Sequence, residues 1–169
     1  MILFTALIPP DDVLAALATE LGETGSDLRW SPPANWHVTL AYYGEDDPEA
    51  RGEWLAQRLA GRSPVDVRLE NAGTFPGVLW LTVAGDDLPP LANAAGADEE
   101  DRPYRPHLTL ARFARERPGL AKPWTWRLSG FTSRSWQATE VALMSSEREP
   151  DGIRYRVVRS FELNRARRS

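Results

Sequence analysis

Both histidines of the chain occur in the same short sequence pattern. The segment Trp36–Ala41 reads Trp-His-Val-Thr-Leu-Ala, and the segment Pro106–Ala111 reads Pro-His-Leu-Thr-Leu-Ala. In a chain of this composition, such a coincidence has a chance of roughly one in ten thousand. Polar and apolar side chains alternate in both segments, which is typical of a half-buried β-strand. The sequence therefore predicts two similar strands, each with one histidine.

Strand geometry determines which side chains of each motif lie together. Successive side chains alternate between the two faces of a strand, so His37 shares a face with Thr39, and His107 with Thr109. Positions i and i+2 are about 6.6–7 Å apart, which lets a phosphate-sized group lie between imidazole and hydroxyl. Two such strands side by side would surround one pocket with two imidazoles and two hydroxyls.

These residue types suit the cleavage of a phosphodiester without a metal. A neutral histidine can accept a proton from attacking water, and a protonated histidine can donate one to the leaving oxygen. Threonine hydroxyls can hydrogen-bond the non-bridging oxygens, where negative charge develops in the transition state. A lone histidine on a strand is more often a structural residue, but the repeated motif favours a function. The spacing alone does not assign the acid and base roles.

Composition excludes several other classes of protein. The chain has 169 residues, of which 42% are hydrophobic and 26% charged, as in a globular domain. It has no cysteine, which excludes disulfides, thiolate zinc clusters and thiol nucleophiles. Two distant histidines without acidic residues at ligand spacing make a poor metal site. No apolar run is near the roughly 18 residues that span a bilayer, and the first ten residues do not resemble a signal peptide. We expect a cytoplasmic monomer with no metal, cofactor or membrane partner.

The charge is unevenly distributed along the chain. The formal net charge is −4, which argues against a broad nucleic-acid-binding surface. Residues 1–101 contain 5 arginines and 18 acidic residues, whereas residues 102–169 contain 15 basic and 6 acidic residues. The basic half is consistent with a surface that faces phosphates. It is equally consistent with two halves whose charges neutralise each other in the fold.

Hydrophobic periodicity predicts a mixed α/β chain with no linker between separate domains. Helices are expected from Asp11 or Asp12 to Leu21, over Pro48–Leu59 and, more briefly, over Leu88–Ala97. A turn at Pro150–Gly152 predicts a hairpin between the last two strands. The expected strands are Ile2–Ile8, Trp36–Tyr43, Val65–Ala72, Val78–Ala84, His107–Phe113, Trp124–Phe131, Trp136–Ser145 and Ile153–Leu163.

Taken together, these segments resemble the 2H phosphoesterase superfamily, which is named for two His-x-Thr-x motifs. Within it, the sequence is most similar to the RNA 2′,3′-cyclic phosphodiesterases, formerly called 2′-5′ RNA ligases. The resemblance covers nearly the whole chain, and its most specific part is Arg102–Arg112. The other matching segments are Leu3–Ala6, Asn35–Leu40 with Tyr43–Gly44, Gly73–Pro76 with Val78–Trp80, Leu143–Ser146, Gly152–Tyr155 and Phe161–Leu163.

The resemblance implies both a fold and an activity. The fold would be one bilobal α+β domain over residues 1–169, with two antiparallel-rich sheets related by pseudo-twofold symmetry around a cleft and helices outside. The activity would be metal-independent hydrolysis of a 2′,3′-cyclic phosphate, on an RNA end or a small cyclic nucleotide, to a 2′-phosphomonoester. His37 would be the proton donor and His107 the proton acceptor, with Thr39 and Thr109 beside the phosphate.

Three further residues are substrate-binding candidates by the same resemblance. Arg112 matches a position associated with the phosphate, although strand alternation places it on the face opposite His107. Arg102 is a candidate for phosphate or ribose, with a solvated surface arginine as the alternative. Phe4 could stack on a base, and core packing of the first strand is the alternative.

One segment departs from the family pattern, and one other function is open. Residues 85–101 are short and contain Pro89, Pro90 and an acidic run, where the family usually has a long amphipathic helix. The helical cover of the second lobe is therefore uncertain from the sequence. The alternative function is a module that binds the phosphate of an RNA end or nucleotide without hydrolysing it.

Overall fold

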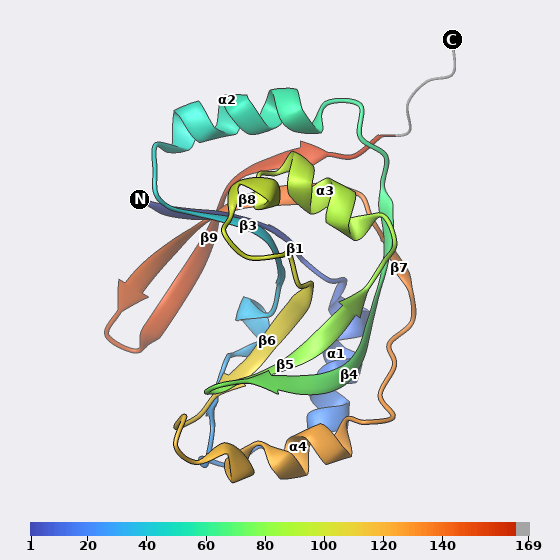
Figure 1. Ribbon diagram of the computed structural model, residues 1–169, viewed down its shortest axis with the longest axis vertical. Coiled ribbons are helices and arrows are strands. Elements are labelled where there is room, and N and C mark those ends of the chain that lie inside the picture. The colour runs from blue at the N-terminus through green and yellow to red at the C-terminus, as the bar shows by residue number, and fades with distance from the viewer. Residues whose placement is uncertain (165–169) are drawn as a thin grey trace.

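The computed structural model describes residues 1–164, which form two antiparallel sheets with helices on their outer sides (Figure 1). The helices are α1 (Asp11–Leu21), α2 (Pro48–Leu59), α3 (Leu88–Ala94) and α4 (Lys122–Arg127), with 3-10 turns η1 (Pro33–Asn35), η2 (Ala97–Glu99) and η3 (Pro118–Leu120). The strands are β1 (Ile2–Leu7), β2 (Arg29–Trp30), β3 (Val38–Glu45), β4 (Val65–Phe75), β5 (Val78–Ala84), β6 (His107–Arg112), β7 (Trp136–Ala138), β8 (Glu140–Glu149) and β9 (Gly152–Glu162).

Each sheet contains one of the two motif strands. The first sheet has the strand order β3-β1-β8-β9, and the second has the order β2-β6-β5-β4-β7. All strand pairs are antiparallel, and β3 of the first sheet contacts β6 of the second. Helices α2 and α3 lie by the first sheet, whereas α1 and α4 lie by the second (Figure 1). This arrangement confirms the expected fold class.

The middle strands of the first sheet are buried on both faces. On β1, Leu3 and Leu7 belong to the main core, while Phe4 and Ala6 belong to a second, smaller cluster on the opposite face. Strand β8 alternates in the same way, with Ala142 and Met144 in the smaller cluster. Because side chains alternate along a strand, such an apolar run fills two separate layers. The smaller cluster, Phe4, Ala6, Ala142 and Met144, lies beside the first motif.

The helices bury the stripes that their sequence spacing predicts. Val13, Leu17 and Leu21 recur every fourth residue in α1 and are at most 2% exposed. Helix α2 begins after Asp47, whose carboxylate accepts a hydrogen bond from the backbone N–H of Glu49 at 3.1 Å. That bond satisfies one of the free N–H groups of the first turn.

The short segment after β5 nevertheless folds into a packed unit. Leu88, Leu91 and Ala92 of α3 are at most 2% exposed, and the helix contacts α2, β3, β4 and η2. Pro89 and Pro90 stand in the first turn of α3, where the missing N–H groups have no intrahelical partner to lose. Proline weakens the interior of a helix, but at these first-turn positions Pro89 and Pro90 are compatible with α3.

The predicted strand over Trp124–Phe131 is wrong, because this segment contains α4. A strand would place Trp124, Trp126 and Leu128 on one face, but Trp126 is 84% exposed while Leu128 is fully buried. Trp124 and Leu128 are four residues apart, so they share one face of a helix. Trp124 packs edge-to-face against Trp30 of β2, with ring centroids 4.7 Å apart.

The predicted strand over Trp136–Ser145 is two strands that belong to different sheets. Strand β7 ends at Ala138 and pairs with β4 in the second sheet, and β8 begins at Glu140 in the first sheet. The hydrophobic periodicity of one segment does not show at which residue the chain leaves one sheet and pairs with a strand of the other. Strand β2, only two residues long, was not predicted, whereas the predicted hairpin at Pro150–Gly152 is confirmed.

The helical face of α4 gives a stability test. Leu128→Ala should reduce the free energy of unfolding by about 2–5 kcal/mol, because it leaves a cavity in the core. Trp126→Ala should change it by no more than about 0.5 kcal/mol, because that ring is in solvent. Urea denaturation of both variants measures the difference. Equal, large losses would mean that both side chains lie on one buried strand face.

Candidate functional site

The second motif strand contains a β-bulge directly after its threonine. Leu79 of β5 pairs with Ala111 of β6, but the next residue, Trp80, pairs with Thr109. Leu110 is therefore an extra residue on β6. A bulge of this kind shifts the alternation of the strand by one residue, so the side chains before and after it no longer follow one simple period.

The first motif strand has a bulge at the same position. Ala6 of β1 pairs with Thr39 of β3, whereas Thr5 pairs with Ala41, which leaves Leu40 as the extra residue. In both motifs the bulge falls on the leucine between the threonine and the alanine. The two strands thus share a local backbone irregularity as well as a sequence, as expected for two lobes related by pseudo-twofold symmetry.

The bulge places Arg112 on the same face as His107. Residues paired directly across antiparallel strands share a face. His107 pairs with Thr82 and Arg112 with Val78, and these two β5 residues are four positions apart, hence on one face. The expectation that Arg112 lies opposite His107 is therefore wrong, because simple alternation does not apply across Leu110.

Each imidazole is oriented by an equivalent hydrogen bond to the backbone. The Nδ1 of His37 lies 2.7 Å from the carbonyl oxygen of Asn35, and the Nδ1 of His107 lies 2.7 Å from that of Arg105. A carbonyl only accepts, so in each ring Nδ1 carries the proton and donates it. The Nε2 atoms are then available for proton transfer. In the first motif, Nε2 of His37 lies 3.0 Å from Oγ1 of Thr39.

His37 is enclosed by aromatic side chains. Its ring centroid is 5.0 Å from that of Phe4 and 5.1 Å from that of Tyr155, which meets it edge-on. Burial by these neighbours lowers the pKa of His37 below the usual 6.5, the hydrogen bond to Asn35 opposes this, and the positive charge of His107 lowers it further. The neutral imidazole is therefore favoured in the free protein.

His107 has an aromatic setting of its own. Its ring centroid is 5.4 Å from that of Phe75 and 6.3 Å from that of Trp80. Trp80 pairs with Gly73 of β4 and lies directly over it, since a Cβ at Gly73 would come within 2.4 Å of the indole. Glycine is required at this position so that the indole can lie flat on the sheet beside His107.

Contacts between the lobes bring the two motifs together. The charge of His107 acts on the pKa of His37, so the two rings lie within electrostatic range. The hydroxyl of Tyr104, just before β6, donates to the carbonyl oxygen of Thr39 at 2.9 Å. Burial raises the pKa of Tyr155, and the positive charge of Arg112 opposes this, so the two groups lie within electrostatic range of each other. Side chains from both sheets thus surround one region.

The remaining predicted site residues lie in different surroundings. Phe4 is in the region of the two motifs, but only 4% of it is exposed, and its ring packs on His37 and Tyr155. Arg102 is exposed in the loop before β6. Tyr155 was not among the residues predicted from the sequence. The predicted hairpin turn at Pro150–Gly152 was the signal that could have found it. Counting alternate positions along the strand from that turn would have placed Tyr155 on the face of the first motif.

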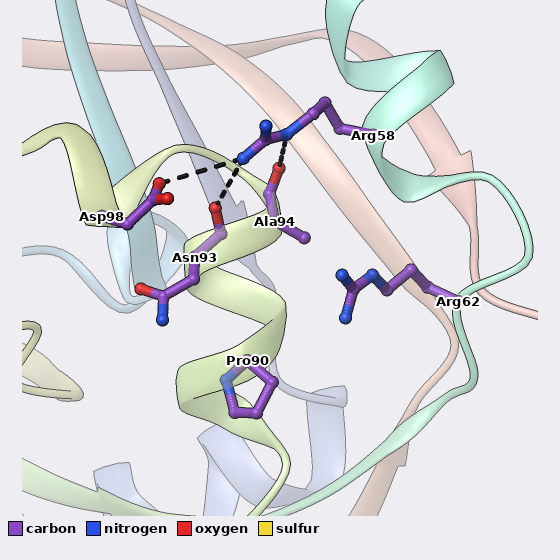
Figure 2. A pocket seen from close by; sticks show the side chains of 6 residues that line it. All are labelled: Arg58, Arg62, Pro90, Asn93, Ala94 and Asp98. Atoms are coloured by element: carbon purple, nitrogen blue, oxygen red, sulfur yellow. Dashed lines mark hydrogen bonds and ion pairs between the residues drawn. The ribbon is translucent and has the colours of Figure 1, made fainter.

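A separate hollow of about 480 Å³ lies between α2 and α3 (Figure 2). The Arg58 guanidinium on its wall donates to the carbonyl oxygens of Ala94 at 2.9 Å and Asn93 at 3.0 Å, and it stacks on Trp54. These carbonyls belong to the last turn of α3, which leaves them without intrahelical donors. Arg58 therefore serves to end α3, and the hollow contains none of the motif residues.

Residues 1–164 contain neither a cluster of metal ligands nor a helix that could span a membrane. No three His, Cys, Asp or Glu side chains within residues 1–164 come together in a way that could hold a metal ion. None of the helices in that range has the length and apolar character needed to cross a membrane.

Comparison with curated proteins identifies relatives along the whole chain. An RNA 2′,3′-cyclic phosphodiesterase of Thermus thermophilus is 32% identical over 186 residues, covering 96% of this chain and 90% of the relative. A protein of the same name from Archaeoglobus fulgidus is 28% identical over 181 residues, covering 96% of this chain and all of the relative.

Solved structures have the same fold. A crystal structure of a Thermus thermophilus protein matches 99% of this chain and 100% of its own, with a TM-score of 0.79 and 28% identity. Escherichia coli LigT in complex with ATP matches 97% of this chain and 98% of its own, with a TM-score of 0.73 and 26% identity. The family model of the 2′-5′ RNA ligase superfamily matches residues 9–150. The chain belongs to this superfamily of 2H phosphoesterases.

Proposed function

We propose that this protein hydrolyses 2′,3′-cyclic phosphates at RNA or nucleotide ends to 2′-phosphomonoesters. The observation that carries the proposal is the matched pair of histidines, each with Nδ1 bound to the carbonyl two residues earlier. That bond fixes the tautomer of both rings and leaves two Nε2 atoms for proton transfer. A site that only bound phosphate would have no need of two imidazoles prepared in the same way.

The relatives support the same activity. The curated relatives from Thermus thermophilus and Archaeoglobus fulgidus are both named RNA 2′,3′-cyclic phosphodiesterase. Escherichia coli LigT, whose fold this chain shares, has been crystallised with phosphate and with ATP. A phosphate group is the part of the proposed substrate that those two ligands contain.

The proposed reaction proceeds in one displacement at phosphorus. Nε2 of His107 accepts a proton from water as the water oxygen forms its bond to phosphorus. The bond from phosphorus to the 3′ oxygen breaks, and Nε2 of His37 donates its proton to that oxygen. The hydroxyls of Thr39 and Thr109 donate hydrogen bonds to the non-bridging oxygens, and Arg112 offsets their negative charge. The product keeps its phosphate on the 2′ oxygen.

The lowered pKa of His37 has a consequence for these roles. A proton donor must be protonated before the reaction, and burial opposes that in the free enzyme. A bound phosphate places negative charge next to the ring, which favours the protonated form and raises the pKa. In this proposal, substrate binding itself charges the donor.

Replacement of either histidine tests the mechanism. His37→Ala and His107→Ala should each lower kcat by about 10²–10⁴, because each removes one proton-transfer group. The assay is product analysis on 2′,3′-cyclic AMP and on a cyclic-ended oligonucleotide, with EDTA present. Trp126→Ala, whose ring is 84% exposed on α4, is the control and should retain full activity. Unchanged turnover in either histidine variant would refute the mechanism, and intact bound substrate would indicate a binding module.

The pH dependence tests the assignment of roles. The alkaline limb of kcat/KM reports the donor in the free enzyme, whereas that of kcat reports it in the complex. Because burial lowers the pKa of His37, the alkaline limb of kcat/KM should lie below about pH 6.5 and that of kcat should lie higher. Phe4→Ala, which opens the ring to water, should move the kcat/KM limb upward. Movement of the acidic limb instead would make His37 the acceptor.

Arg112 can be tested by its effect on substrate binding. Arg112→Gln should raise KM about tenfold or more, because it removes a charge-assisted hydrogen bond to phosphate. Arg117→Gln is the matched control, since Arg117 is exposed beyond the end of β6. Steady-state kinetics on 2′,3′-cyclic AMP give both values. If the two variants behave alike, the bulge at Leu110 does not serve to direct Arg112 toward the phosphate.

A further inference from the structure

The β8–β9 hairpin extends past the rest of the first sheet (Figure 1), and its two faces differ in chemistry. On one face, Arg156 forms an ion pair with Glu147 at 3.3 Å, and Arg154 one with Glu149 at 3.7 Å. Paired charges of this kind are what a solvent-exposed sheet face requires. The charges on this face are therefore neutralised within the hairpin and need no binding partner.

The opposite face of the hairpin exposes apolar side chains. Ile153, Tyr155 and Val157 alternate along β9, and Val157 pairs with Met144 of the smaller core cluster, so the three lie on the face of that cluster. Ile153 is 49% exposed and Val157 is 52% exposed. Three alternate positions span about 13 Å. We call Ile153, Tyr155 and Val157 the β9 stripe.

The β9 stripe meets the candidate catalytic site at its middle residue. Tyr155 meets the ring of His37 edge-on at 5.1 Å. The side-chain amide of Asn35, whose own carbonyl holds His37, donates to the carbonyl oxygen of Ile153 at 3.1 Å. The hairpin is thus fixed directly to the loop that orients the first histidine, and a chain that leaves the site along β9 in either direction passes over Ile153 or Val157.

Arginine side chains lie beside the β9 stripe. Arg148 pairs with Ile153 across the hairpin and therefore shares its face, and it is exposed. Within residues 1–164 Arg148 makes no ion pair, in contrast to Arg154 and Arg156 on the other face. Arg112, from the second sheet, lies within electrostatic range of Tyr155. Apolar and aromatic groups flanked by free guanidinium groups match single-stranded nucleic acid, which offers bases and phosphates together.

We propose that the β9 stripe binds the nucleotides on the 5′ side of the cyclic phosphate, which makes an oligonucleotide a better substrate than a cyclic mononucleotide. This inference rests on the proposed function. The base or ribose would pack on the apolar side chains, and Arg148 would contact a phosphate of the incoming chain. The stripe would act on substrate choice and leave the chemistry at phosphorus to the two motifs.

The test compares two substrates on the full-length protein. Kinetics are measured with 2′,3′-cyclic AMP and with an oligoadenylate of six nucleotides that ends in a 2′,3′-cyclic phosphate. The double variant Ile153→Ser/Val157→Ser and the single variant Arg148→Gln should each lower kcat/KM for the oligonucleotide about tenfold, with cyclic AMP within about twofold. Arg154→Gln, on the opposite face of the same hairpin, is the matched control and should leave both values unchanged.

The outcomes separate this inference from the proposed function. Hydrolysis of cyclic AMP by the unaltered protein tests the proposed function, and hydrolysis by each variant shows that the variant is folded. Given that hydrolysis, equal effects on both substrates, or no preference of the unaltered protein for the oligonucleotide, would overturn the inference. A dimer of the unaltered protein in light scattering that the double variant dissociates would also overturn it, because the stripe would then bind a second copy of the chain.

Discussion

One extra residue directly after the threonine of each motif determines which side chains the site contains. The bulges at Leu40 and Leu110 interrupt the alternation directly after the threonine. Without the bulge, Arg112 would share a face with the buried Leu108, and a charged group would enter the core at high cost. With it, the histidine, the threonine and the arginine lie on one face, while both leucines and the following alanine stay in the core. The set of side chains that share the site's face is therefore determined by the bulges more than by the regular part of the strands.

The two lobes provide similar histidines in different surroundings. Phe4 and Tyr155 enclose His37, whereas Phe75 and Trp80 lie beside His107. Acid–base catalysis by two imidazoles needs one proton between them, so their environments must differ. Burial lowers the pKa of His37 in the free protein, so the proposed donor role requires the bound phosphate to reverse that difference. Pseudo-twofold symmetry places two similar imidazoles in the site, and their different aromatic neighbours make the environments of the two rings unequal.

The sequence was sufficient for the features that depend on local pattern. Strand alternation located the motif strands, and their repetition identified the family, as the comparisons confirm. It was insufficient where tertiary structure decides. Trp124, Trp126 and Leu128 fit one face of a strand, and a helix is distinguished there only by tertiary packing, which places Trp124 against Trp30 and leaves Trp126 exposed. The face of Arg112 depends on pairing with β5, since a bulge needs a partner strand to exist.

The distribution of charge acquires a physical meaning from the fold. A net charge of −4 is unfavourable for a protein that binds RNA along its whole surface. On the β8–β9 hairpin, acidic partners neutralise Arg154 and Arg156, whereas Arg148, on the face of Tyr155, has no ion pair with any residue of 1–164. On this hairpin, neutralisation of Arg154 and Arg156 therefore leaves positive charge on the face of the β9 stripe. In the proposed function, this arrangement would attract the terminal nucleotides of a chain more than the rest of it, which agrees with chemistry directed at a terminal phosphate.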